Sequence, residues 1–151
     1  MRNIPKTDIK ICPVTLGTMT YGSPVGFEDA VALTKYAVDK GINLIDTANM
    51  YEGYNRYAGS AGGVAEEIIG KALKSFYRKD VLVATKVGMK VGPAPEDEGT
   101  SPAAIEKQLD KSLKRLDTDY IDIYYLHRPD PAVPLVDILS SLKKQMDLGK
   151  I

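Results

Sequence analysis

The sequence is poor in the residues that most often hold disulfides and metal ions. It contains one cysteine, Cys12, one histidine, His127, and no tryptophan. A lone cysteine cannot form an internal disulfide, which is typical of proteins in a reducing cytosol. One cysteine and one histidine are also too few for an ordinary zinc site, so we expect no metal.

An excess of one charge and long apolar runs are missing as well. The 20 basic and 20 acidic residues give a formal net charge of zero, which leaves no basic face for nucleic acid. No apolar run is long enough to cross a bilayer, and residues 1–5 (MRNIP) lack the apolar segment of a signal peptide. We therefore expect a cytoplasmic protein with no nucleic-acid or membrane partner.

What is present suits one ordinary domain. The chain has 151 residues, of which 44% are hydrophobic, so we expect a single domain spanning residues 1–151. Strand-like and helix-like patterns alternate along it. The predicted strands are 11–18, a segment beginning at Ile42, 80–86 and 120–126, and the predicted helices are 28–40, 64–76, one opened by Ser101 and Pro102, and 135–148.

Four strand–helix units in succession predict an α/β fold with a parallel sheet and right-handed crossovers. Two closures satisfy this order: an open doubly wound sheet and a (β/α) barrel. In either of them, ligands bind at the carboxyl ends of the strands.

Burial can also be predicted for two local features. In helix 28–40, the apolar stripe that should face the core contains Ala30, Leu33 and Ala37, and Val31, Thr34 and Val38 widen it. The acidic run at residues 96–98 lies in a loop, and we interpret it as solvated surface rather than as a metal site.

Ionisable residues end three of the predicted strand faces. Asp46, Lys86 and His127 each follow an apolar row on the same face of a strand. Because the carboxyl ends of parallel strands meet at one edge, we expect these three side chains to gather at one mouth. Tyr51 lies five residues past Asp46 and is placed to fold back over that mouth.

Such a group has a chemical interpretation. A tyrosine hydroxyl has a reference pKa of about 10. A nearby lysine ammonium lowers the pKa of the phenol, and a nearby carboxylate keeps that lysine charged and in place. The phenol can then act as a general acid toward a carbonyl oxygen that gains negative charge, while a neutral histidine orients the carbonyl.

At these residues the sequence resembles the aldo-keto reductase superfamily. The matching motifs are Asp46-Thr47-Ala48-x-x-Tyr51, residues 66–73 (EEIIGKAL), Ala84-Thr85-Lys86 and residues 119–129 (DYIDIYYLHRP). The resemblance covers nearly the whole chain. It implies a TIM (β/α)8 barrel, of which only four βα units are present here, as the N-terminal half-barrel.

The resemblance also implies an activity, the NADPH-dependent reduction of an aldehyde or ketone to an alcohol by an oxidoreductase. Tyr51 would be the proton donor, Lys86 and Asp46 would tune it, and His127 would position the carbonyl of a small-molecule substrate. The residues that would lie near the nicotinamide are Gly17, Thr18, Met19 and Asp46.

The sequence departs from the superfamily in two ways. A full barrel needs about 250 residues, and by the resemblance much of the NADPH site belongs to the half that is absent here, so the cofactor site in this chain is incomplete. Arg128 also stands where many members carry an aromatic residue after the histidine.

A half-barrel exposes strand edges and apolar faces, which favour association. We therefore expect self-association or a complementary half-barrel as the protein partner. Two alternatives stay open at this point. One is a non-catalytic half-barrel, either a truncated product or an association module that lacks a complete cofactor site. The other is a flavodoxin-like open sheet that binds another ligand.

Overall fold

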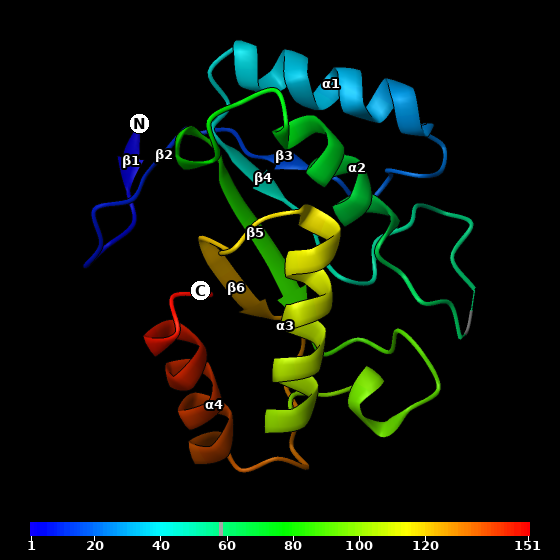
Figure 1. Ribbon diagram of the computed structural model, residues 1–151, viewed down its shortest axis with the longest axis vertical. Coiled ribbons are helices and arrows are strands. Elements are labelled where there is room, and N and C mark those ends of the chain that lie inside the picture. The colour runs from blue at the N-terminus through cyan, green and yellow to red at the C-terminus, as the bar shows by residue number, and fades with distance from the viewer. Residues whose placement is uncertain (58) are drawn as a thin grey trace.

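The computed structural model describes residues 1–57 and 59–151. Four strands form one parallel sheet in the order β3-β4-β5-β6, which confirms the predicted α/β order of strands and helices (Figure 1). The strands are β3 (Leu16–Gly17), β4 (Leu44–Asp46), β5 (Leu82–Val87) and β6 (Ile123–Leu126). The helices are α1 (Phe27–Asp39), α2 (Val64–Leu73), α3 (Pro102–Leu116) and α4 (Leu135–Asp147), with short 3₁₀ helices η1 (Arg78–Asp80) and η2 (Pro95–Asp97).

The first strand differs from the predicted one. The predicted strand 11–18 was wrong, because the segment divides into β2 (Lys10–Ile11) and β3, with Pro13 between them. Proline has no N–H to donate to a strand ladder, so it interrupts pairing there. β2 instead pairs antiparallel with β1 (Arg2–Asn3), a hairpin that the sequence analysis did not predict.

The fourth strand is also shorter than predicted and begins at Ile123 rather than at residue 120. The side chain of Asp122 takes the place of a ladder carbonyl, because its Oδ2 accepts a hydrogen bond from the Val83 N–H at 2.8 Å. The same oxygen lies 2.7 Å from the Arg78 guanidinium. The local side-chain bonding therefore sets where regular pairing starts.

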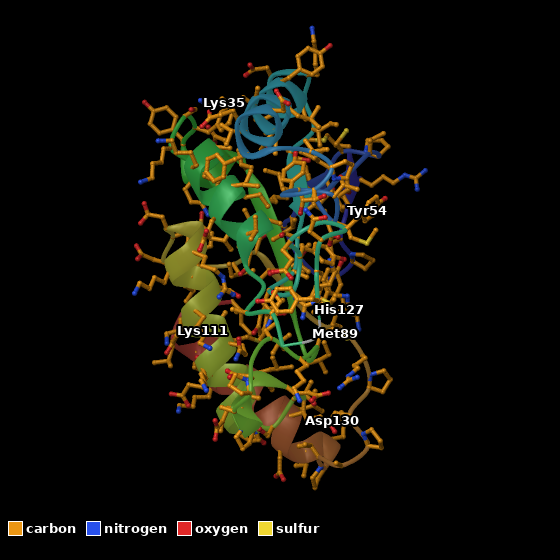
Figure 2. All side chains as sticks on the ribbon, turned by 90° about the vertical axis from the view of Figure 1, so that its right-hand side faces the viewer. Lys35, Tyr54, Met89, Lys111, His127 and Asp130 are labelled. Carbon is orange, nitrogen blue, oxygen red and sulfur yellow. The ribbon has the colours of Figure 1, made fainter. Side chains whose placement is uncertain are left out.

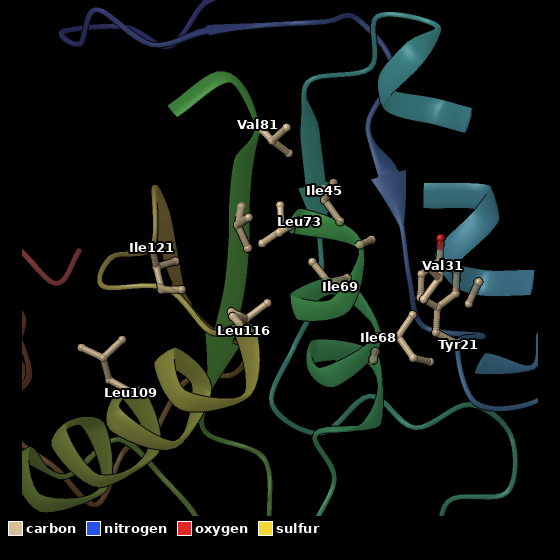
Figure 3. Packing of buried hydrophobic residues seen from close by; sticks show 14 residues of the cluster. Tyr21, Val31, Ile45, Ile68, Ile69, Leu73, Val81, Leu109, Leu116 and Ile121 are labelled. Carbon is tan, nitrogen blue, oxygen red and sulfur yellow. The ribbon is translucent and has the colours of Figure 1, made fainter. Parts of the chain in front are cut away.

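The hydrophobic core lies between the sheet and its helices. Ile45 of β4 pairs with Val83 of β5, and both side chains are fully buried against α2 and α3. Figure 1 shows α2 and α3 lying over this face of the sheet, and Figure 3 shows Ile68 and Ile69 of α2 packed in the same cluster. We call this side of the sheet the outer face.

Helix α1 packs less of its surface than predicted. Ala30 and Ala37 are buried as expected, but Leu33 is 42% exposed, so that prediction was wrong. Thr34, which was expected to widen the stripe, is fully buried; its hydroxyl donates to the Ala30 carbonyl at 2.8 Å and lies 2.9 Å from the Tyr21 hydroxyl. A hydroxyl that has its hydrogen-bond partners can be buried at little cost in free energy, so the buried face of α1 includes Thr34 and leaves Leu33 exposed.

Helices α2 and α3 approach each other closely because of Gly70. A Cβ added to Gly70 would lie 2.4 Å from the Arg115 carbonyl oxygen of α3, so no larger residue fits without moving the helices apart. Close contact between these helices fixes the outer layer behind β5.

Helix α4 is different, because it leaves an apolar row exposed. These residues are each more than half exposed; they are Leu135, Val136, Leu139 and Met146 of α4, and Leu148 directly after it. In the part of the chain that the structure describes, no helix is both long enough and apolar enough to span a bilayer.

Candidate active site

The strand register brings the three predicted strand-end residues to one edge of the sheet. Asp46 ends β4, Lys86 lies one residue before the end of β5, and His127 directly follows β6. Asp46 pairs with Ala84 across β4 and β5, and Lys86 pairs with Tyr125 across β5 and β6. Because side chains alternate along a strand, these residues lie on the face of the sheet opposite the outer helices. We call that side the inner face.

The ammonium of Lys86 is the centre of the group. Its Nζ lies 2.7 Å from Asp46 Oδ2, 2.8 Å from the Thr47 carbonyl oxygen and 3.3 Å from the Tyr51 hydroxyl. Three acceptors match the three N–H donors of an ammonium, so its position is well determined. The side chains of Lys86 and Asp46 are 13% and 31% exposed, which leaves the ion pair open to a ligand on the inner face.

Tyr51 is held over the mouth by its own backbone. Its N–H donates to the Ala48 carbonyl at 3.0 Å, and its carbonyl accepts from the Ala65 N–H in the first turn of α2, also at 3.0 Å. The ring lies 4.7 Å from Lys86 Nζ, measured to the ring centroid. The loop after β4 thus returns the phenol to the ion pair, as the sequence analysis expected.

His127 is the fourth residue of the candidate catalytic group and lies against Tyr51. Its backbone N–H donates to the Val87 carbonyl at 2.7 Å, and its ring stands edge-on to Tyr51, with the ring centroids 5.8 Å apart and an 80° angle between planes. Burial lowers the pKa of His127, and the Lys86 charge lowers it further, while Asp46 opposes them. The imidazole is therefore neutral at neutral pH and carries one N–H.

The residues suggested for the nicotinamide have different surroundings. Gly17 pairs with Asp46 across β3 and β4, and a Cβ added to it would meet no atom within 4 Å. Thr18 is fully buried and its hydroxyl donates to the Asp46 carbonyl at 3.0 Å, so it supports the strand rather than facing open space. Met19 is 55% exposed.

Behind the site, a buried ion pair was missed by the sequence analysis. Glu66 of α2 is fully buried, and its carboxylate lies 2.6–2.7 Å from the guanidinium of Arg115 in α3. The same carboxylate accepts a hydrogen bond from Thr85, the neighbour of Lys86 in β5, at 2.6 Å. This network ties the two outer helices to the strand that carries the lysine. Its only sequence signal was an acidic residue on the apolar side of a helix.

The loop after β5 holds a second misjudged residue. Asp97 was predicted to be solvated, but it is 5% exposed. Its Oδ1 accepts from Gln108 at 2.9 Å and lies 3.1 Å from both Lys107 and Lys111 of α3. Burial raises the pKa of Asp97, but the hydrogen bonds from Lys111 and Lys107 outweigh burial and lower it to about 2. The loop is therefore fixed to α3 by a charged side chain.

The fold and the site together define a class. Four parallel βα units bring an aspartate, a lysine, a tyrosine and a histidine together at the carboxyl ends of their strands, where βα barrels place their active sites. The sequence pattern of the Aldo/keto reductase family matches residues 13–151. The chain belongs to the aldo-keto reductase family.

Individual relatives show how much of such a protein the chain represents. It is 36% identical to the aldo-keto reductase YhdN of Bacillus subtilis, over 99% of this chain and 44% of that protein. It is 32% identical to a probable voltage-gated potassium channel subunit beta of Arabidopsis thaliana, over 98% of this chain and 43% of that protein. The chain thus spans less than half the length of these relatives.

A solved structure agrees with this coverage. The crystal structure of a thermostable aldo-keto reductase, Tm1743, in complex with the inhibitor epalrestat matches with a TM-score of 0.83 at 34% identity. The match covers 99% of this chain and 50% of the other. The four βα units therefore correspond to half of an aldo-keto reductase TIM barrel.

Proposed function

We propose that this chain carries the catalytic residues of an NADPH-dependent reductase that converts an aldehyde or ketone to an alcohol. The observation that carries the proposal is the position of Lys86 Nζ, 2.7 Å from Asp46 and 3.3 Å from the Tyr51 hydroxyl. A cytosolic setting fits the single free thiol of Cys12.

The residues present fit the nicotinamide end of NADPH. Gly17 leaves open space beside Asp46, where a flat ring can approach the inner face without meeting a side chain. By the family resemblance, the rest of the dinucleotide site lies in the half of the barrel that this chain does not span. NADPH, when bound, supplies the hydride that goes to the carbonyl carbon.

The chain's own residues then handle the carbonyl oxygen. His127 is neutral and its single N–H donates to that oxygen, which holds the substrate beside Tyr51. Tyr51 transfers its phenolic proton to the oxygen as negative charge develops there. The Lys86 ammonium stabilises the phenolate left behind, and Asp46 keeps the ammonium at this position.

A complete barrel requires a second half, and we propose that it comes from a second copy or from a complementary half-barrel. Two apolar edges support this. The row on α4 is exposed at one end of the sheet, and Phe27, Leu33 and Tyr36 of α1 are exposed at the other. Beside the edge strand β6, the Ile121 N–H donates to the Lys150 carbonyl at 2.9 Å, so the residues after α4 already lie along this edge.

The test measures aldehyde-dependent loss of NADPH absorbance over a range of chain concentrations. Activity should rise with concentration as halves associate, and Tyr51→Phe should reduce it to a small residual rate. The matched control is Tyr54→Phe, because Tyr54 lies in the same loop and is 69% exposed. Full activity in Tyr51→Phe would remove Tyr51 from its role.

The competing function is a non-catalytic half-barrel that acts by association alone, and the exposed α4 row favours it as much as it favours a barrel partner. NADPH binding separates the two. A reductase half should show quenched tyrosine fluorescence and a raised melting temperature with NADPH, because a ligand that binds only the folded state stabilises it. No response to NADPH at any chain concentration, with no turnover, would contradict the catalytic proposal.

A further inference from the structure

An open cavity of about 790 Å³ lies among the loops at the carboxyl ends of the strands, and the proposed mechanism uses none of its residues. It is lined by the loops that follow β4, β5 and β6, among them Met50, Met89, Lys90 and Arg128. Met50 directly precedes Tyr51, and Arg128 directly follows His127. Figure 2 shows the molecule from the side of these loops, with His127 and Met89 labelled.

Three cations but one carboxylate line this cavity. Arg56 is one of the cations, and its charge is already used inside the protein. Its guanidinium donates to the Met50 carbonyl at 2.9 Å and to the Lys90 carbonyl, and it lies 3.5 Å from Glu52 outside the cavity. Arg56 therefore ties the loops after β4 and β5 together. The two cations that remain available are those of Lys90 and Arg128.

Lys90 and Arg128 share a single carboxylate. Glu98 pairs with the Arg128 guanidinium and lies 4.0 Å from Lys90 Nζ. The side chains of Lys90 and Arg128 are 58% and 45% exposed, so both can reach a ligand. One carboxylate cannot neutralise two cations, and a cleft concentrates the positive potential that is left over. The planar guanidinium of Arg128 matches a carboxylate in particular.

The walls of the cavity suit an apolar body. The side chains of Met50 and Met89 line it from two different loops. Methionine is flexible and polarizable, so such a pair adapts to apolar groups of varied shape. Arg128 lies next to His127 in the chain, with about 3.8 Å between their Cα atoms. The cavity wall and the catalytic side chains therefore come from consecutive residues, Met50–Tyr51 and His127–Arg128, and a substrate that reaches both needs an apolar linker between its carbonyl and its charged group.

We infer that the substrate of this site is an aldehyde or ketone that also carries a carboxylate. The carbonyl lies at Tyr51 and His127, the apolar body packs on Met50 and Met89, and the carboxylate binds Arg128 and Lys90 in exchange for part of their contact with Glu98. This inference rests on the proposed reductase function, and it assigns Arg128 and Lys90 as specificity residues rather than as groups that take part in the proton transfer.

The test is a binding measurement, so that it does not depend on turnover. Terephthalaldehydic acid and its neutral methyl ester are titrated into the chain by calorimetry or NMR. The acid should bind about tenfold more tightly than the ester at low salt, and the preference should shrink as salt screens the charges. Equal binding of acid and ester at low salt would overturn the inference.

Three variants sharpen the test. Arg128→Gln and Lys90→Gln should each remove most of the preference for the acid. Glu98→Gln should increase it, because the competing carboxylate is gone. Lys79→Gln is the matched control, since Lys79 lies in η1 at the opposite end of β5, and it should leave the preference unchanged. A weaker preference in Glu98→Gln would contradict the inference.

NADPH binding separates this inference from the proposed function. Should Arg128→Gln weaken the binding of NADPH while leaving the acid and ester unchanged, these cations serve the cofactor and the inference fails. A chain that binds the acid through Arg128 but never oxidises NADPH would instead contradict only the reductase proposal.

Discussion

The outer and inner faces of the same sheet differ in almost every respect. On the outer face, Ile45 and Val83 are fully buried under α2 and α3. On the inner face, Tyr125 is 45% exposed, and the Lys86–Asp46 ion pair is open to solvent. Neighbouring residues of one strand therefore have different roles. Thr85 joins the buried network behind β5, whereas Lys86 points to the mouth.

This difference shows how the fold separates stability from chemistry. The outer layer is packed from elements within this chain, so substitutions there should act on the free energy of unfolding. The inner face and its rim hold the polar groups and the exposed apolar edges, so substitutions there should act on catalysis, ligand binding and association. The predictions below test this separation, from the largest expected effect to the smallest.

Removing the buried carboxylate of the outer layer should have the largest effect. Glu66→Ala leaves the Arg115 guanidinium without its partner, and a broken buried ion pair typically costs about 3–5 kcal/mol of unfolding free energy. Urea denaturation measures this. Glu67→Ala is the matched control, since the next residue of α2 is exposed and should cost roughly 0.5 kcal/mol or less. Similar losses of unfolding free energy in both variants would contradict the proposed difference between the two faces.

The inner-face lysine should show the opposite pattern. Lys86→Met should slow aldehyde reduction about a hundredfold, because the phenolate of Tyr51 loses its neighbouring charge. The unfolding free energy should change by only about 1 kcal/mol or less, since Asp46 is 31% exposed and can be solvated by water. A large loss of stability together with an unchanged rate would reverse the assignment of the two faces.

The apolar row on α4 should govern association. Leu139→Gln should weaken association by roughly 1.5–3 kcal/mol, the value of burying one leucine side chain. Analytical ultracentrifugation measures it. Tyr77→Ser is the control, because Tyr77 is more exposed still, at 78%, but lies on neither edge. A wild-type chain that stays a 16.5 kDa monomer at every concentration would contradict the association proposal.

Acid should weaken the attachment of the loop after β5. The pKa of Asp97 is lowered to about 2 in the folded state from an ordinary value of 3.8. Its contribution is therefore present above about pH 4 and is lost as the pH falls toward 2, amounting to at most about 2 kcal/mol. Asp97→Asn should flatten this part of the stability–pH curve. An unchanged curve in the variant would show that Asp97 does not stabilise the fold.

Much of the fold and the grouping of the candidate residues could be predicted, because both follow from chain periodicity. Asp46, Lys86 and His127 come together since each lies at a strand end, and parallel strands end at one edge. Tyr51 could be expected near the mouth because it lies five residues past Asp46, but its role as proton donor came from the family motif.

Other features of the fold, a strand break and the extent of burial of three side chains, could not be predicted from the sequence for physical reasons. Pro13 interrupted a strand whose apolar pattern was otherwise continuous. Asp97 and Glu66 are charged, so composition alone assigns them to the surface, and their burial depends on cations that lie far away in sequence on α3. Leu33 followed the helical period but faced outward, because the Thr34 hydroxyl is satisfied in the core by the Ala30 carbonyl and the Tyr21 hydroxyl.

The central claim is that Tyr51 and Lys86 act as one unit in carbonyl reduction. The most direct test compares the rates of Tyr51→Phe, Lys86→Met and the double variant under identical conditions. If the lysine acts through the phenol, the double variant should be no slower than Tyr51→Phe alone, because the lysine has nothing left to stabilise. A double variant slowed by the product of the two single losses would show independent roles and would contradict the claim.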